Sequence, residues 1–136
     1  MELGIIIVDH GSRRAESNDV VVEVAALFAK RFGELFPIVE AAHMELGEPS
    51  IGSAYARCAE RGAQRIVVMP FFLGPGKHWS EDIPRLTEAA AARFPRTRAM
   101  VAEPLGADDL LLRLLAKRIN LCLERQGTAL SVATRM

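Results

Sequence analysis

Short apolar runs alternate with longer amphipathic stretches along the chain. Residues 3–8 read Leu-Gly-Ile-Ile-Ile-Val, a β-branched run that is typical of a strand buried on both faces of a parallel sheet. Further along, Val20, Val24 and Phe28 recur at helical spacing, which predicts an amphipathic helix. The whole pattern predicts strands at 3–8, 37–42, 65–69 and 97–102, and helices at about 15–32, 50–61, 80–94 and 108–125.

The order of these elements, in which every strand is followed by a helix, is typical of an α/β protein. Crossover connections of this kind are right-handed and give a parallel sheet with helices on both faces. We therefore expect a four-stranded parallel sheet in the flavodoxin-like order 2-1-3-4. Residues 1–126 are expected to form one domain, followed by a flexible tail at 127–136.

Composition and charge narrow the class of protein. The chain has 136 residues, of which 50% are hydrophobic and 25% are charged, as in ordinary globular domains. Its 17 basic and 17 acidic side chains cancel, so we expect neither a nucleic-acid nor a membrane partner. The run at 3–8 is too short to span a membrane. We expect a cytoplasmic protein, or one in an organelle stroma if a transit peptide has been removed. Cys58 and Cys122 are expected to be buried, reduced thiols.

All three histidines follow predicted strands. His10 comes after the first strand, His43 directly after the second, and His78 at the end of the loop after the third. Ligands of open parallel sheets bind beyond the carboxyl ends of the strands, so one rim of the sheet is expected to carry every histidine. A neutral imidazole binds transition metals, and its pKa near about 6.5 lets it move protons at neutral pH.

A carboxylate stands close to these histidines in the sequence. If the chain stays extended from His43 to Glu45, the two side chains point the same way. Two histidines and a carboxylate suit Fe, Co, Ni or Zn. The alternative for Glu45 is an ordinary surface or helix-entry carboxylate.

Two loops carry further candidate chemistry. In the first loop Ser12 is a candidate helix cap, and Arg13 and Arg14 follow it at the positive end of the first predicted helix, which suits a carboxylate or a phosphate. The loop after the third strand is apolar beside Gly-Pro-Gly, so Phe72 and Trp79 are candidates to line a pocket for a flat aromatic ligand, unless Phe72 belongs to the core.

The same loop contains the pair Gly76-Lys77, which is found in phosphate-binding loops. The remainder of that motif is missing, since Phe71 stands at its first glycine and His78 stands at its Ser or Thr. We therefore expect no nucleotide, and Lys77 becomes a candidate partner for an acidic substituent.

Three stretches together give a specific resemblance: IIIVDHGSRRAESN, AHMELGEPSI and VVMPFFLGPGKHWSEDIP. In this order they are similar to the small class II chelatases, above all the sirohydrochlorin ferrochelatases of the SirB type, which are related to the CbiX cobaltochelatases. The segment AEPLGADDLLLRLLAKRI resembles the end of the same family.

The resemblance implies a parallel α/β chelatase fold and ATP-independent insertion of a divalent metal, Fe²⁺ before Co²⁺ or Ni²⁺, into sirohydrochlorin. It implies that His10 and His78 handle the metal and that Glu45 is a recurrent acidic position. His43 belongs to the AHMEL form of the second stretch, which looks more like the ferrochelatase branch. Short members resemble one half of longer chelatases with two such units, which implies a homodimer.

The proposed roles follow from this chemistry. His10 and His78 would deliver the metal, and Glu45 would accept a pyrrole proton. Arg13, Arg14 and Lys77 would pair with carboxylates of the tetrapyrrole, and the loop with Phe72 and Trp79 would cover the ring. Ser12 and Asn18 are supporting candidates.

Other interpretations stay open at this point. A cobalt or nickel chelatase fits the same ligands, because affinity order alone does not select the metal. A non-catalytic metal carrier or tetrapyrrole sensor also fits the rim. A histidine phosphatase is disfavoured, since Asp9 precedes His10 where such an enzyme has an arginine.

Overall fold

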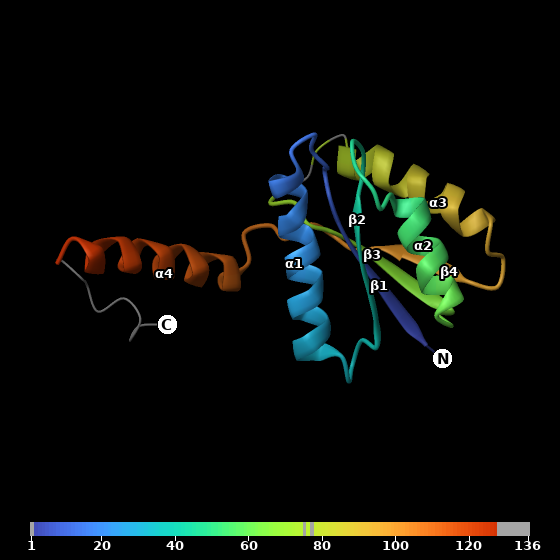
Figure 1. The fold of residues 1–136 in the computed structure, drawn as a ribbon, viewed down its shortest axis with the longest axis horizontal. Coiled ribbons are helices and arrows are strands. Elements are labelled where there is room, and N and C mark those ends of the chain that lie inside the picture. The colour runs from blue at the N-terminus through green and yellow to red at the C-terminus, as the bar shows by residue number, and fades with distance from the viewer. Residues whose placement is uncertain (1, 75, 77, 128–136) are drawn as a thin grey trace. The chain divides into compact units, whose positions relative to one another are not determined.

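The computed structural model describes residues 2–74, 76 and 78–127, without the side chains of His78 and Trp79. It has the strands β1 (Leu3–Asp9), β2 (Ile38–His43), β3 (Arg65–Pro70) and β4 (Arg98–Val101) (Figure 1). The helices are α1 (Ala15–Phe32), α2 (Ile51–Glu60), α3 (Ile83–Ala92) and α4 (Asp109–Arg125), and a π-helical turn, η1 (His78–Asp82), precedes α3. Contacts divide the chain into Met1–Pro104 and Leu105–Met136, and each unit is described by itself.

The strands form one parallel sheet in the order β2-β1-β3-β4, which confirms the predicted fold class and strand order. β1 is central and pairs with β2 from Gly4 to Asp9 and with β3 from Leu3 to Val8. Its Ile6 and Val8 are fully buried, as the β-branched run predicts for a strand covered on both faces.

Helices cover both faces of the sheet (Figure 1). α1 packs on β1 and β2, where Val21 and Ala25 of the helix meet Ile5 and Ile7 of the sheet. α2 and α3 pack on the opposite face over a larger core. The fully buried members of that core include Ile6, Val8, Ala54, Tyr55, Cys58, Ile66, Val68 and Ile83.

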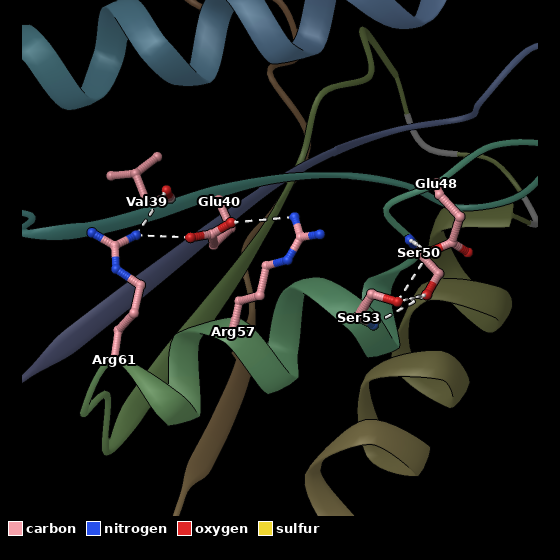
Figure 2. Close-up of polar contacts among 7 residues, drawn as sticks. All are labelled: Val39, Glu40, Glu48, Ser50, Ser53, Arg57 and Arg61. Atoms are coloured by element: carbon pink, nitrogen blue, oxygen red, sulfur yellow. Dashed lines mark hydrogen bonds and ion pairs between the residues drawn. The ribbon is translucent and has the colours of Figure 1, made fainter.

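α2 begins at a well-formed cap (Figure 2). The Ser50 hydroxyl oxygen accepts a hydrogen bond from the Ser53 amide at 3.1 Å. Glu48 accepts one from the Ser53 hydroxyl at 3.0 Å. The sequence predicts a helix from about residue 50, and α2 begins at Ile51 with Ser50 as the cap that satisfies the free Ser53 amide.

The other end of α2 is tied to the edge strand β2 (Figure 2). Arg61 lies 2.8 Å from a Glu40 carboxylate oxygen, and Arg57 lies 3.9 Å from the other. The Arg61 guanidinium also donates to the carbonyl oxygens of Val39 and Pro37. These contacts satisfy backbone groups on an exposed sheet edge, and they fix β2 relative to the helix that follows it.

Most boundaries differ from the predictions by one to three residues, and two of these differences lie next to the candidate site. β2 ends at His43, one residue later than expected, so His43 belongs to the sheet. The helix expected from residue 80 starts as η1, and α3 proper begins at Ile83 with Pro84 in its first turn. Proline lacks an amide hydrogen and is favoured at the first helical positions, which explains this start.

The two cysteines are free, as predicted, but only one is buried. Cys58 lies on the buried face of α2, and its burial, together with the nearby Glu40 carboxylate, raises the pKa of its thiol to about 12, while Arg61 opposes the shift. Cys122 is exposed, which corrects the expectation, because the only buried residue in α4 is Asn120. Within the described ranges, each helix is too short or too polar to cross a lipid bilayer.

Candidate functional site

The carboxyl ends of β1, β2 and β3 meet at one rim of the sheet, as the histidine pattern predicts. His10 follows β1 and His43 closes β2. The Phe71 amide, just after β3, donates to the Val8 carbonyl at 2.7 Å, which draws the start of the third loop to the end of β1. Parallel pairing therefore places segments from distant parts of the sequence side by side.

The exposed His10 imidazole lies flat on the Phe72 ring, with 4.0 Å between the centroids and 12° between the planes. Phe72 is only 7% exposed and belongs to the core on the α2 and α3 side. Phe72 therefore belongs to the core, which was the alternative to a pocket-lining role, and one face of its ring contacts His10. The stacking orients the plane of the His10 imidazole at the rim of the sheet.

Glu45 lies beside His10 through a continuation of the β1–β2 ladder. The Met44 amide donates to the Asp9 carbonyl at 2.9 Å, and the Glu45 amide donates to the His10 carbonyl at 3.1 Å. The Glu45 side chain is exposed. Two of the predicted site residues are therefore backbone neighbours, although 35 positions separate them in the sequence (45 − 10).

Gly11 makes this approach feasible. Its φ is +89°, a region that disfavours side chains, and a Cβ built on it would lie 1.7 Å from the Glu45 carbonyl oxygen. The same Cβ would lie 3.2 Å from the His43 Cβ. The glycine thus allows the first loop to pass directly over the loop that carries Glu45.

His43 has a different environment from His10. Its side chain is 1% exposed, and its Nδ1 lies 2.7 Å from the Asp9 Oδ1. The condition for His43 and Glu45 to point the same way, an extended chain between them, is not met, because the strand ends at His43 and residues 44–49 form a series of bends. With Nδ1 engaged by Asp9, only Nε2 remains as a nitrogen that could bind a metal.

The first loop is held by α1. The Asn18 side chain accepts from the Ser12 amide and donates to the Ser12 carbonyl, both at 2.8 Å. Ser12 is not the helix cap: the cap position is Arg14, whose amide donates to the Ser12 hydroxyl oxygen at 3.1 Å. Arg13 and Arg14 are exposed at the amino end of α1, as the anion-site interpretation requires.

The complete predicted metal set cannot be assembled from the described side chains. Among them, no three His, Cys, Asp or Glu residues lie close enough to hold a metal ion. Lys77 and the side chains of His78 and Trp79 lie outside the part of the chain that the structure describes. His10 and Glu45 come together, and the roles of the other candidates stay predictions.

The contact that sequence reasoning missed is the one between Asp9 and His43. Asp9 directly precedes His10 in the sequence, yet its carboxylate contacts His43 on the neighbouring strand. A signal was present: aligning the apolar run of β1 with the run at 38–42 places Asp9 opposite His43.

Comparison with known proteins gives a consistent result. The CbiX family model matches residues 4–121. The chain is 52% identical over 120 residues to the sirohydrochlorin ferrochelatase, chloroplastic, of Arabidopsis thaliana, covering 88% of this chain and 52% of that protein. It is 31% identical to the sirohydrochlorin cobaltochelatase of Sulfolobus acidocaldarius, covering 93% of this chain and 98% of that one.

The fold has a solved counterpart in SirB from Bacillus subtilis with Fe³⁺. The TM-score is 0.73 at 30% identity, covering 87% of this chain and 46% of that structure. The chain thus spans about half the length of the Arabidopsis and Bacillus proteins and nearly all of the Sulfolobus protein.

Replacing Gly11 with alanine is expected to destabilise the fold more than the same change at Gly62. Gly62 also has a positive φ, +99°, but a Cβ there meets nothing within 4 Å. Gly62→Ala should therefore cost only the backbone term, about 1–2 kcal/mol. Gly11→Ala adds a clash with backbone, so its free energy of unfolding, measured in urea, should fall further. Equal losses would show that the close approach at Gly11 is absent in solution.

Proposed function

Because the chain belongs to the CbiX family, we propose that it is a sirohydrochlorin chelatase, a lyase that inserts Fe²⁺ into the ring in siroheme biosynthesis without a nucleotide. The observation that carries the proposal is the 52% identity to a protein named as a sirohydrochlorin ferrochelatase. The exposed His10 and Glu45 support it, because their backbones are hydrogen-bonded at the rim of the sheet and their side chains are a metal-binding imidazole and a carboxylate.

His10 and His78 would hold the metal before transfer. Imidazole nitrogens suit Fe²⁺ and Co²⁺, and an incomplete ligand set leaves coordination positions open for the ring nitrogens. Glu45 completes the set from the neighbouring loop, and His43 is the fourth candidate through its Nε2. A metal that is substrate must be released, so a closed four-ligand cage would work against turnover.

The protein must also remove protons. Insertion of M²⁺ displaces the N–H protons of the pyrrole rings, and a base within hydrogen-bond reach accepts them. Glu45 fits this role because its exposed carboxylate lies on the loop next to His10. A histidine that has released its metal is the alternative acceptor.

Sirohydrochlorin carries many carboxylates around a flat conjugated ring. Arg13 and Arg14 at the start of α1, together with Lys77, are the proposed partners of some of them through charge-assisted hydrogen bonds. Ser12 is positioned next to these arginines by Asn18. Phe72 and Trp79 would supply apolar surface against the ring.

A cobalt chelatase is the second candidate. The relative from Sulfolobus acidocaldarius favours it. That protein is named a sirohydrochlorin cobaltochelatase, and the match covers 98% of its length. The same donor atoms bind both metals, so the distinction concerns the metal and leaves the site unchanged.

The proposal also concerns the cellular compartment in which the protein acts. We infer an aqueous one, the cytoplasm or an organelle stroma. The chloroplastic name of the Arabidopsis relative supports the stroma.

Anaerobic absorbance of sirohydrochlorin with substoichiometric protein tests the function, with Fe²⁺, Co²⁺ and Ni²⁺ compared against protein-free mixtures. We expect accelerated conversion over many turnovers, with the rate order ranking the metals. Binding of the ring without turnover would identify a carrier or sensor instead. Absence of both would refute the chelatase assignment, and hydrolysis of p-nitrophenyl phosphate would then support a phosphatase.

The His10 nitrogens are expected to be needed for metal insertion. His10→Phe keeps a ring that can stack on Phe72 but removes both nitrogens, so turnover should fall by about 100-fold or more. The melting temperature should stay near that of the wild type because His10 is exposed. Turnover close to wild type at an unchanged melting temperature would remove His10 from the mechanism.

Removal of the guanidiniums in Arg13→Ala/Arg14→Ala should weaken binding of sirohydrochlorin more than binding of the metal. Each lost charge-assisted hydrogen bond is worth about 1.5–3 kcal/mol. The matched control is Arg65→Ala/Arg98→Ala, which removes two exposed arginines at the start of β3 and β4, at the other end of the sheet. Ring affinity is measured by fluorescence quenching. Equal effects of the two double variants would point to net charge alone.

We infer a homodimer, since the chain matches about half of the longer relatives and nearly all of the shorter one. Sedimentation equilibrium at working concentration should give twice the chain mass of 14.9 kDa. A monomer of full activity would contradict a site shared between two copies.

A further inference from the structure

A partly buried polar cluster, formed by Asp9, His43 and Asn18, lies next to the two loops of the candidate site. We propose that Asp9, His43 and Asn18 are positioning residues, which hold the first loop (residues 10–14, with His10) at a fixed place against the second loop (residues 44–49, with Glu45). In this assignment His43 acts through the loops and is not itself a metal ligand. The inference rests on the proposed function only in taking His10 and Glu45 as the metal site.

The contact between Asp9 and His43 is the innermost part of the cluster. The two residues are the last paired positions of β1 and β2, and their side chains meet at 2.7 Å. His43 is 1% exposed and Asp9 is 19% exposed. A buried imidazole costs stability unless its polar atoms are bonded, and a carboxylate partner is a strong one in these surroundings. The contact therefore joins the two strand ends at the level where the loops begin.

The His43 ring also supports the second loop from beneath. The His43 amide donates to the Pro49 carbonyl at 2.8 Å, which closes the bends that follow β2. A Cβ at Gly47 would lie 3.3 Å from the His43 Cδ2 and 2.8 Å from the Asn18 Nδ2. Gly47 thus fits between the imidazole and the amide, and both side chains define where the second loop passes.

Asn18 fixes the first loop to the same support. Its amide forms two hydrogen bonds with the backbone of Ser12, and Asn18 itself belongs to α1, which is anchored through Val21 and Ala25. Gly11, next to Ser12, lies directly against the Glu45 carbonyl. The first loop is therefore held by α1 on one side and by the second loop on the other.

This arrangement matters because His10 and Glu45 come from different loops. A metal site tolerates errors of only about 0.2 Å in its distances, so the loops must keep a constant separation. The Glu45 to His10 hydrogen bond of 3.1 Å is a backbone contact between them at this point. The buried side chains supply the rigidity that one exposed hydrogen bond lacks.

Co²⁺ binding to the full chain, without tetrapyrrole, tests the proposal through the d–d absorption of the bound metal. His43→Phe and Asp9→Leu keep the side-chain bulk but remove the hydrogen bond. Each should weaken Co²⁺ binding about tenfold, the size of effect seen in metalloproteins when a residue that supports the metal ligands is lost. The spectrum at saturating Co²⁺ should keep its shape, because the ligands themselves remain. Asp9→Asn keeps an oxygen that accepts from Nδ1, so it should retain most of the affinity.

Tyr55→Phe is the matched control for stability. It removes the hydrogen bond between Tyr55 and the Thr97 hydroxyl, 2.6 Å long and located at the opposite end of the sheet from the two loops. Tyr55→Phe should lower the melting temperature as the Asp9 and His43 variants do, yet leave Co²⁺ affinity within about twofold. If Tyr55→Phe weakened Co²⁺ binding equally, the effect of the Asp9 and His43 variants would come from lower overall stability, and the proposal would be overturned.

Other outcomes of the same experiment also test the positioning role. A changed d–d band in His43→Phe at saturation would make His43 a ligand and refute its positioning role. Unchanged affinity in both His43→Phe and Asp9→Leu, or no Co²⁺ binding by the wild type, would refute it too. If the wild type binds Co²⁺ and the variants behave as expected, but no metal enters sirohydrochlorin, the proposed function fails while the positioning role stands.

Discussion

The parallel register of β1 against its two neighbours is the constraint on which the site depends. It places the end of β1 beside the end of β2 and beside the start of the loop after β3, so that His10, Glu45 and Phe72 meet although they are distant in sequence. A slip of one residue would turn every side chain of β1 to the other face of the sheet. Burial of Ile6 and Val8 makes such a slip costly, so the core that stabilises the fold also sets the geometry at the rim.

Much of the fold could be predicted, because its signals are local and mutually consistent. The β-branched run of β1, the helical spacing in α1 and the regular alternation of elements lead to the parallel sheet and to its order. The errors occur where a backbone choice depends on partners. β2 extends to His43 because Asp9 is there to pair with it, and the start of α3 is delayed to Ile83, where Pro84 fits the first turn. The partner of His43 is not visible in a window of neighbouring residues, whereas Pro84 is a local signal for the start of α3.

The site was predictable in its residue types and less so in its contacts. His10 and Glu45 could be proposed from their places after strands, and the structure makes them neighbours. The different environments of His43 and Glu45 could not be predicted. They follow from the bends after residue 43 and from the room that Gly11 and Gly47 leave. The sequence shows a glycine, but only the fold shows which carbonyl or ring passes next to it.

The two histidines at this rim occupy opposite environments, and this difference bears on how a transferable metal can be handled. A group that passes a metal to a ring must be accessible, and the exposed position of His10 fits the delivering role proposed for it. A group that maintains the geometry during transfer must not move when the metal leaves, and a buried imidazole bonded to a carboxylate meets that requirement. If both histidines were exposed, the site would lose its shape at each release. If both were buried and bonded, the metal would be held too firmly to exchange. The proposed division between His10 as the delivering residue and the Asp9–His43 pair as its support would resolve this conflict within a chain of 136 residues.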